Sequence, residues 1–398
     1  MNREADDPKV EHMRIAMLGI KGLPSRFGAD RVVEALVEEL STRHEITVYA
    51  CAALVPRDPG FTRFRQIAIP SLAGKYLRMP SVLLLSAFHA LLRGRYDLVH
   101  VHNFEAGFIV PLLRLRFPVV TTSHGPAYLR EKWGGPARLL MRFCDRLSVL
   151  GASATTAVSR TQAEEYQHRF HRSVEWIPNA VPPVLPCDRA AGNARLAAAG
   201  APPGGFLLFV AGRILPSKGC HLLLEAVRGL DPSLAVVVVG DASAMPHYEA
   251  ELRALGQGRA FFVGFIEEPA TLFGLAVSAR LFVFPSLVEA MAMTLLEIAA
   301  LEIPAVVSDI PENRSVLDER HVRFFRSGVT EDLARVLRET LDDPAGTAER
   351  ARTCSAFLRQ TYRRSEIAAR YERVYAQAVH GNKGRRRTDG VARSADGG

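Results

Sequence analysis

The sequence predicts an α/β protein with two doubly wound domains, each a parallel sheet covered by helices. Short apolar strands alternate with helical segments from Met13 to about residue 179, a pattern typical of a parallel sheet. A proline- and glycine-rich stretch from Pro178 to Gly205 interrupts the alternation, which restarts at Phe206. A chain of 398 residues is long enough for two domains, each with its own core.

The first half carries seven short runs rich in apolar residues, as expected for buried strands. We expect these strands at residues 13–19, 46–50, 64–70, 97–102, 118–124, 154–159 and 174–179. The segments between them favour helices at residues 31–40, 82–92, up to 115, 137–150 and 163–168. The helix with the sequence SVLLLSAFHALL is apolar over a broad arc, which fits a core helix better than a patch resting on a membrane.

The second half repeats the alternation. We expect strands at residues 206–212, 234–241, 260–265, 280–286 and 304–309, and helices at 221–230, 247–256, 268–279, 290–300, 333–341, 348–362 and 365–378. The predicted domains are residues 1–183 and residues 184–364. A helix at 365–381 is expected to pack back towards the first domain, and the basic, apolar-poor residues 382–398 are predicted to be disordered.

Composition narrows the class of protein. Fifty Lys and Arg against 42 Asp and Glu give a net charge of +8, which suits an anionic ligand or an anionic membrane surface. The basic residues are dispersed and no nucleic-acid-binding motif occurs, so nucleic acid is not expected as a partner. The polar start and the lack of a long uncharged apolar run predict a cytoplasmic protein without a signal or a spanning helix. The five scattered cysteines favour neither a disulfide framework nor a zinc site.

Two glycine-containing loops follow predicted strands, where parallel sheets bind ligands. Gly19, Gly22 and Gly28 do not have the dinucleotide-binding spacing, so they form either a ligand loop or a simple turn. In the second loop, Arg213 and Lys218 could bind a diphosphate through a guanidinium fork and a mobile ammonium. The alternative is that both are ordinary solvated charges.

Two carboxylates follow the strand ending at Ser286. Glu289 is expected at the start of a helix and Glu297 within it, about 12 Å further along the axis. This separation excludes the pair of a retaining glycoside hydrolase, which needs carboxylates about 5 Å apart. Free N–H groups at the helix start, near Ala290, could bind a phosphate, and the apolar neighbours of Glu297 predict a buried carboxylate with a partner.

Taken together, the motifs resemble the retaining glycosyltransferases of family 4, which have the GT-B fold of two Rossmann-like domains facing a central cleft. The resemblance covers residues 13 to 378 and rests on the glycine loop, IPNAV, GR-x4-KG from Gly212 to Gly219, Glu289-x7-Glu297 and PAVVSD. The segments GIKGLPSRFG and His124 to Gly135 also resemble a bacterial rhamnosyltransferase-like group.

The resemblance implies roles for individual residues. Arg213 and Lys218 would hold the donor diphosphate, Glu289 the donor sugar and Glu297 the ribose, while His124 would lie near the transferred sugar. His102 matches less well and is expected to be structural. The implied catalytic residues are His124, Arg213, Lys218 and Glu289. The implied donor-binding residues are Gly28, Arg213, Lys218, Glu289, Ala290, Met291, Thr294 and Glu297.

The implied activity is hexosyl or deoxyhexosyl transfer, with retention, from a nucleoside diphosphate sugar to an acceptor hydroxyl. Neither a metal nor a cofactor is expected, the nucleotide sugar being a co-substrate. A glycan or lipid-linked acceptor of bacterial cell-surface polysaccharide or glycolipid synthesis is implied. The basic, leucine-rich segment from Lys75 to Arg95 suits a peripheral location at the inner membrane surface. Ala290 departs from the family, which usually has glycine there, and the added Cβ predicts a tighter or shifted donor pocket. A nucleotide-sugar epimerase and a non-catalytic nucleotide-sugar-binding component are the alternatives.

Overall fold

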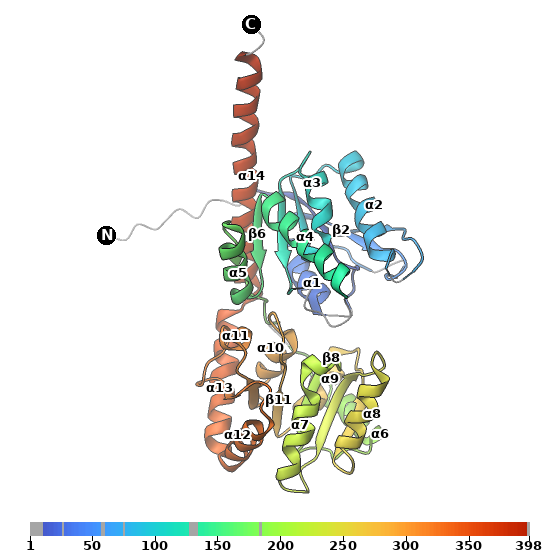
Figure 1. Ribbon diagram of the computed structural model, residues 1–398, viewed down its shortest axis with the longest axis vertical. Helices are drawn as coiled ribbons and strands as arrows, with labels where there is room; N and C mark the ends of the chain where they lie inside the picture. The colour runs from blue at the N-terminus through green and yellow to red at the C-terminus, as the bar shows by residue number, and fades with distance from the viewer. Residues whose placement is uncertain are drawn as a thin grey trace, which may run out of the picture. The chain divides into compact units, whose positions relative to one another are not determined.

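The computed structural model describes residues 11–25, 28–56, 60–74, 76–126, 134–182 and 185–395, with side chains up to Gly381. The chain divides into two compact units (Figure 1). Unit 1 comprises residues 1–178 and 364–398, and unit 2 comprises residues 179–363. The first division falls after Pro178 rather than after the predicted residue 183, which itself lies outside the described residues.

In the described part of unit 1, seven parallel strands form a sheet in the order β3-β2-β1-β4-β5-β6-β7. The strands are β1 (Arg14–Leu18), β2 (Glu45–Cys51), β3 (Arg65–Ile69), β4 (Leu98–His102), β5 (Val119–Ser123), β6 (Ala154–Ala157) and β7 (Glu175–Trp176). The order reverses at β1, which pairs with β2 on one side and with β4 on the other. Ile15 therefore lies opposite both Ile46 and Leu98.

Helices cover both faces of this sheet, as the predicted strand and helix alternation requires. They are α1 (Gly28–Leu40), α2 (Arg78–Arg93), the 3-10 helix η1 (Phe104–Ile109), α3 (Val110–Leu113), α4 (Gly135–Gly151), α5 (Arg160–Phe170) and α14 (Arg364–Ala395). The connections that contain α2, α3 and α4 move along the sheet in the direction opposite to the connection that contains α1. Because such crossovers are right-handed, α2, α3 and α4 lie on the face opposite α1. On the other face, α14 packs against α1, β4, β5 and β6, and His44 Nε2 lies 3.0 Å from Glu372 Oε1.

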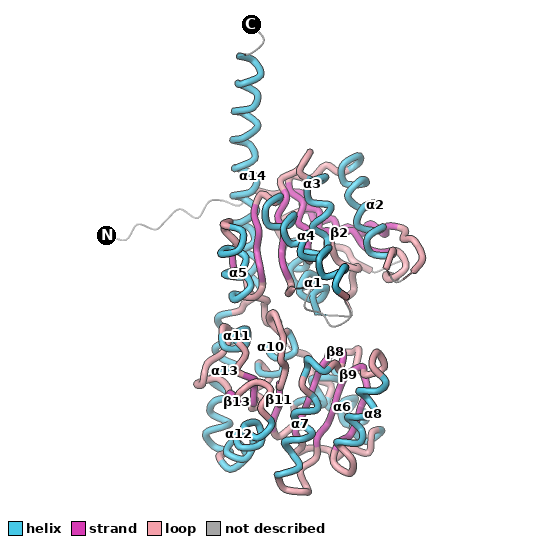
Figure 2. The backbone as a smooth tube through the Cα atoms, in the orientation of Figure 1, coloured by secondary structure: helices cyan, strands magenta, loops and turns pink. Residues whose placement is uncertain are grey.

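In unit 2, six described parallel strands follow the order β10-β9-β8-β11-β12-β13 (Figure 2). They are β8 (Leu207–Arg213), β9 (Val236–Asp241), β10 (Ala260–Gly264), β11 (Leu281–Phe284), β12 (Ala305–Ser308) and β13 (Arg323–Phe325). The helices are α6 (Arg189–Ala198), η3 (Pro216–Lys218), α7 (Cys220–Ala226), η4 (Val227–Gly229), α8 (Pro246–Leu255), α9 (Pro269–Ala276), α10 (Met293–Ala299), α11 (Pro311–Arg314), α12 (Thr330–Asp342) and α13 (Pro344–Thr361).

The ends of several elements differ from the sequence prediction. Helix α10 begins at Met293, three residues after the expected Ala290, so Glu289 lies in a loop. Strand β13 was not expected because a three-residue strand carries too little periodic signal. Helix α14 continues through Ala395, so the prediction of disorder is wrong for residues 382–395. Residues 382–395 contain no proline and four arginines, and arginine favours helix even where few apolar residues occur.

A buried carboxyl in α4 predicts a pH-dependent stability. Asp145 is 1% exposed, and its burial, only partly offset by the hydrogen bond donated by Tyr166 at 3.1 Å, raises its pKa to about 7. The folded protein therefore holds a proton that the unfolded chain releases near pH 4, and this group makes stability fall as pH rises from about 4 to 7. The expected loss is on the order of 4 kcal/mol. Thermal unfolding across this pH range should show a Tm that falls as pH rises in the wild type. The Asp145→Asn variant should lack this contribution.

Candidate active site

The residues that are predicted to bind phosphate lie where the strand order of the second sheet reverses. Strands β8 and β11 are neighbours there, although β9, which follows β8 in the chain, pairs with β8 on the other side. The loops after β8 and β11 therefore leave the same edge of the sheet side by side. Ligands of open parallel sheets bind at such a point, beyond the carboxyl ends of the strands.

A close backbone contact joins these two loops. Gly219 has a φ of +70°, and a Cβ at this position would lie 2.1 Å from the carbonyl oxygen of Pro285. Beside it, the N–H of Leu287 donates to the carbonyl of Ser217 at 2.8 Å. Glycine is needed here both for the left-handed backbone and for the close approach.

This contact brings Lys218 to Glu289. The Lys218 ammonium donates to Glu289 Oε1 at 2.6 Å, and the two side chains are 27% and 10% exposed. An ammonium has three N–H donors, so Lys218 can bond Glu289 and an anionic ligand together. The resemblance implied separate roles for these residues, whereas the structure makes them one charged pair.

A further carboxyl, which the sequence analysis missed, lies near this pair. Glu312 belongs to α11, and burial together with the nearby Glu289 carboxylate raises its pKa. Glu312 therefore lies near the Glu289 carboxylate, so a second acid is close to the Lys218–Glu289 pair. No sequence signal pointed to it, because a four-residue helix has no clear periodicity.

Asn179 holds the loop between Glu289 and α10, because its side-chain amide donates to the carbonyl of Met291 at 2.9 Å. Its backbone N–H also lies 3.1 Å from Met291 Sδ. Thus the IPNAV segment, whose role the sequence left open, fixes the backbone beside Glu289. Ala290 and Thr294 are half-buried in this region.

The position of Glu297 agrees with its apolar neighbours, since this residue of α10 is only 1% exposed. However, the predicted 12 Å separation from Glu289 assumed one continuous helix. Because α10 begins at Met293, three of the seven intervening residues form a loop and that helical measure does not apply. Arg213, at the end of β8, is exposed and lies opposite Asp241, whose pKa is lowered by hydrogen bonds from Ser243 and by the Arg213 charge.

In unit 1, the corresponding reversal of strand order lies between β1 and β4. A Cβ on Gly19, which has a φ of +92°, would lie 1.9 Å from the carbonyl oxygen of His102. The Asn103 amide donates to the carbonyl of Gly19 at 3.0 Å. Gly28 is the exposed first residue of α1 and has no atom near a Cβ position, so no close approach requires glycine there.

His124 follows β5 at this same edge, and its Nε2 lies 3.2 Å from Nδ1 of the fully buried His102. Behind them, His100 contacts the Tyr375 hydroxyl at 2.8 Å and the Thr122 hydroxyl at 2.6 Å. Burial lowers the pKa of His100 and His102 well below the ordinary value, so both are neutral at pH 7. His102 is fully buried, and its assignment as a structural histidine stays a prediction. Residues 127–133 of the segment resembling rhamnosyltransferases lie outside the described residues.

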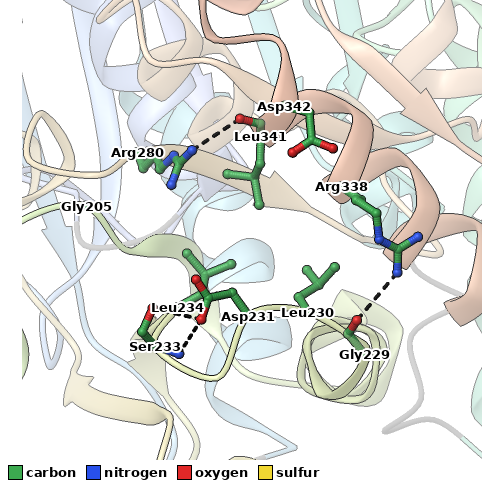
Figure 3. A pocket seen from close by; sticks show the side chains of 10 residues that line it. All are labelled: Gly205, Gly229, Leu230, Asp231, Ser233, Leu234, Arg280, Arg338, Leu341 and Asp342. Carbon is green, nitrogen blue, oxygen red and sulfur yellow. Dashed lines mark hydrogen bonds between the residues drawn. The ribbon is translucent and has the colours of Figure 1, made fainter.

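A pocket of about 350 Å³ lies at the opposite edge of the second sheet (Figure 3). Its residues precede β8, β9 and β11 or belong to α12, so it lies at the amino ends of the strands, away from Lys218. Arg280 donates to the carbonyl of Leu341 at 3.2 Å, and Arg338 donates to that of Gly229 at 3.4 Å. These guanidinium groups bond the backbone and serve as useful controls for charges at the candidate site.

Comparisons with known proteins agree with this architecture. The model of Glycosyltransferase Family 4 matches residues 28–184, and that of Glycosyl transferases group 1 matches residues 196–358. A D-inositol 3-phosphate glycosyltransferase from Arthrobacter sp. (strain FB24) is 28% identical over 282 residues, which are 66% of this chain and 66% of that protein. A UDP-Gal:alpha-D-GlcNAc-diphosphoundecaprenol alpha-1,3-galactosyltransferase from Escherichia coli is 24% identical over 61% of this chain and 65% of its own length.

Solved structures share the fold over nearly the whole chain. Sucrose-phosphate synthase from Thermosynechococcus elongatus superposes with a TM-score of 0.78 at 20% identity, covering 93% of this chain and 100% of that one. Anabaena Alr3699/HepE in complex with UDP and glucose gives a TM-score of 0.76 at 18% identity, covering 92% and 100%. Two parallel sheets, the two matched family models and these shared folds show that the chain belongs to the glycosyltransferases of family 4, with the GT-B fold.

Proposed function

We propose that this glycosyltransferase moves a hexosyl or deoxyhexosyl group from a nucleoside diphosphate sugar to an acceptor hydroxyl, with retention at the anomeric carbon. The observation that carries the proposal is the Lys218–Glu289 pair, 2.6 Å apart, at the strand-order reversal of the second sheet. A cation and a carboxylate held together suit a donor whose diphosphate is anionic and whose sugar offers hydroxyl groups. The structure of HepE with UDP-glucose is of the same fold.

The charges of the site suggest how the reaction is assisted. Negative charge develops on the diphosphate as the bond to the sugar breaks, and fixed cations that face it lower the barrier. Lys218 would supply this charge directly, with Arg213 beside the same loop. Glu289 would orient the ammonium and accept a hydrogen bond from the sugar. Under this proposal the protein's own cations perform the task, and no metal is needed for departure of the diphosphate.

For the acceptor, we propose a glycan or a lipid-linked sugar of bacterial cell-surface polysaccharide or glycolipid synthesis. The Escherichia coli relative, whose name specifies a diphosphoundecaprenol-linked acceptor, supports this choice. In the part of the chain that the structure describes, no helix has the length and apolarity needed to cross a membrane. We further propose that the protein works in the cytoplasm, at the inner face of the membrane.

The test is a transfer assay on the full chain. A thermal-shift panel of UDP, GDP, dTDP and ADP sugars first identifies the donor, which is then incubated with glycan and undecaprenyl-linked acceptors in the presence and absence of EDTA. The anomeric coupling of the product, measured by NMR, should match that of the donor, and EDTA should leave the rate unchanged. An epimerised nucleotide sugar without acceptor product would indicate an epimerase. Donor binding without turnover would indicate a non-catalytic component.

A further inference from the structure

Helix α2 is apolar on two sides. Its inner side packs into the core of unit 1 through Val82, Leu83, Ala87 and Ala90. Its outer side exposes further large apolar residues at helical spacing. These are Leu84 (41% exposed), Leu85 (45%), Phe88 (49%) and Leu92 (80%). Packing against the sheet accounts only for the inner side, because a single buried stripe is enough to hold a surface helix.

Helix α4 has an outer side of the same character, with two parallel stripes. Arg138, Arg142 and Arg146 recur every four residues and are exposed. Beside them, Leu139 is 71% exposed and Phe143 is 54% exposed. Residues four apart lie on the same side of a helix, so arginine and apolar side chains form adjacent rows. Such a helix suits a lipid interface, where apolar side chains enter the acyl boundary and arginines reach the headgroups.

The two helices belong to one layer of unit 1. α2 packs against α3, and α3 packs against α4, as Figure 1 also shows. Leu115, just after α3, is 77% exposed. We call the outer sides of α2 and α4, together with Leu115, the α2–α4 surface. Of the large apolar residues exposed in the described chain, only Leu54, Phe265 and Val288 lie outside the segment from Leu72 to Phe143.

The charged residues of this layer are mostly basic. The described residues from 60 to 126 and from 134 to 151 contain three acids, Asp97, Glu105 and Asp145. Asp97 pairs with Arg14 at 3.0 Å, Glu105 is partly buried, and Asp145 is buried. Eight arginines belong to or border the helices of the layer: Arg78, Arg93, Arg95, Arg114, Arg116, Arg138, Arg142 and Arg146. An anionic partner is therefore complementary, whereas a second copy would place arginines against arginines.

From these observations we propose that the α2–α4 surface docks on a bilayer that contains anionic lipids. Apolar side chains on two helices of this layer would insert at the boundary of the acyl chains, and the arginines would bind the headgroups. This inference rests on the proposed function for its purpose, the delivery of a lipid-linked acceptor. Each of these helices follows a strand and so begins at the edge of the sheet that carries His124. A membrane along the layer would thus adjoin that edge.

Vesicle co-sedimentation of the full chain tests the proposal. The vesicles are pure phosphatidylcholine or phosphatidylcholine with about 30% phosphatidylglycerol, a fraction chosen so that the bilayer carries a strong negative surface potential. We expect binding to the anionic vesicles that weakens with salt, and much less binding to the neutral ones. The double substitution Leu85→Ser and Phe88→Ser should weaken binding roughly tenfold or more, since both side chains would leave the lipid. Leu139→Ser with Phe143→Ser should act in the same way.

A matched control is the pair Leu54→Ser and Phe265→Ser, one leucine and one phenylalanine that are 42% and 37% exposed outside the surface. This control should bind like the wild type. Loss of binding in the control as well, equal binding to neutral vesicles, or no vesicle binding at all would overturn the proposal. Self-association in solution that the Leu139 and Phe143 substitutions abolish would instead identify a second copy as the occupant. The nucleotide-sugar thermal shift of each variant is independent of lipid, so its loss would bear on the proposed function and not on docking.

Discussion

Replacing Lys218 by alanine is expected to weaken binding of the nucleoside diphosphate sugar by roughly 100-fold, because a charge-assisted hydrogen bond to the diphosphate is lost. The substitution also leaves Glu289, which is 10% exposed, without its ammonium partner and close to the bound anion. Both effects act against the donor. Isothermal titration with the nucleotide sugar that gives the largest thermal shift measures the change directly.

Two further variants test whether donor affinity depends on the cation at position 218 or on the positive charge of the protein in general. Lys218→Arg keeps a cation and should retain part of the affinity, although a planar guanidinium cannot reproduce the position of the ammonium. Arg338→Ala removes a cation from the opposite edge of the same sheet, where it bonds the carbonyl of Gly229, and should leave donor affinity unchanged. A nucleotide-sugar shift that survives in Lys218→Ala would contradict the phosphate assignment.

Much of the fold could be predicted because most strands are short apolar runs and most crossovers contain a helix. The pairing of Lys218 with Glu289 could not be predicted in the same way. These residues are 71 positions apart, and their contact depends on β8 and β11 becoming neighbours. Strand order is a tertiary property, set by which apolar faces pack together, and local periodicity does not specify it.

The start of α10 shows a second limit of local patterns. Residues 290–292 are good helix formers, yet they lie in the loop whose Met291 carbonyl accepts a hydrogen bond from Asn179. A tertiary contact here overrides intrinsic helix propensity. The same loop bears on Ala290. Among the described residues other than glycine, positive φ occurs at Asn103, His171 and Glu302, so the backbone at Ala290 does not require glycine. Its Cβ therefore affects the space left for a donor and not the path of the chain.

Replacing Gly219 by alanine is expected to cause a large loss of stability in unit 2. A residue with a side chain at a φ of +70° is strained by about 1–2 kcal/mol, and here the Cβ would also lie 2.1 Å from the Pro285 carbonyl oxygen. One of the two loops must move to relieve this overlap. With the steric overlap added, we expect a total cost of roughly 3 kcal/mol or more, a fall in Tm of about 6–12 °C.

Gly258→Ala provides the matched control, because Gly258 has a φ of +79° but no atom within 4 Å of a Cβ position. It should lose only the backbone contribution, about 2–8 °C. The difference between the two variants isolates the contact between the Lys218 loop and the Glu289 loop. Since that contact sets the ion pair, Gly219→Ala should also weaken donor binding, whereas Gly258→Ala should not. Equal falls in Tm, with donor binding retained in both variants, would show that the two loops are not held together by this contact and that another feature positions Lys218 beside Glu289.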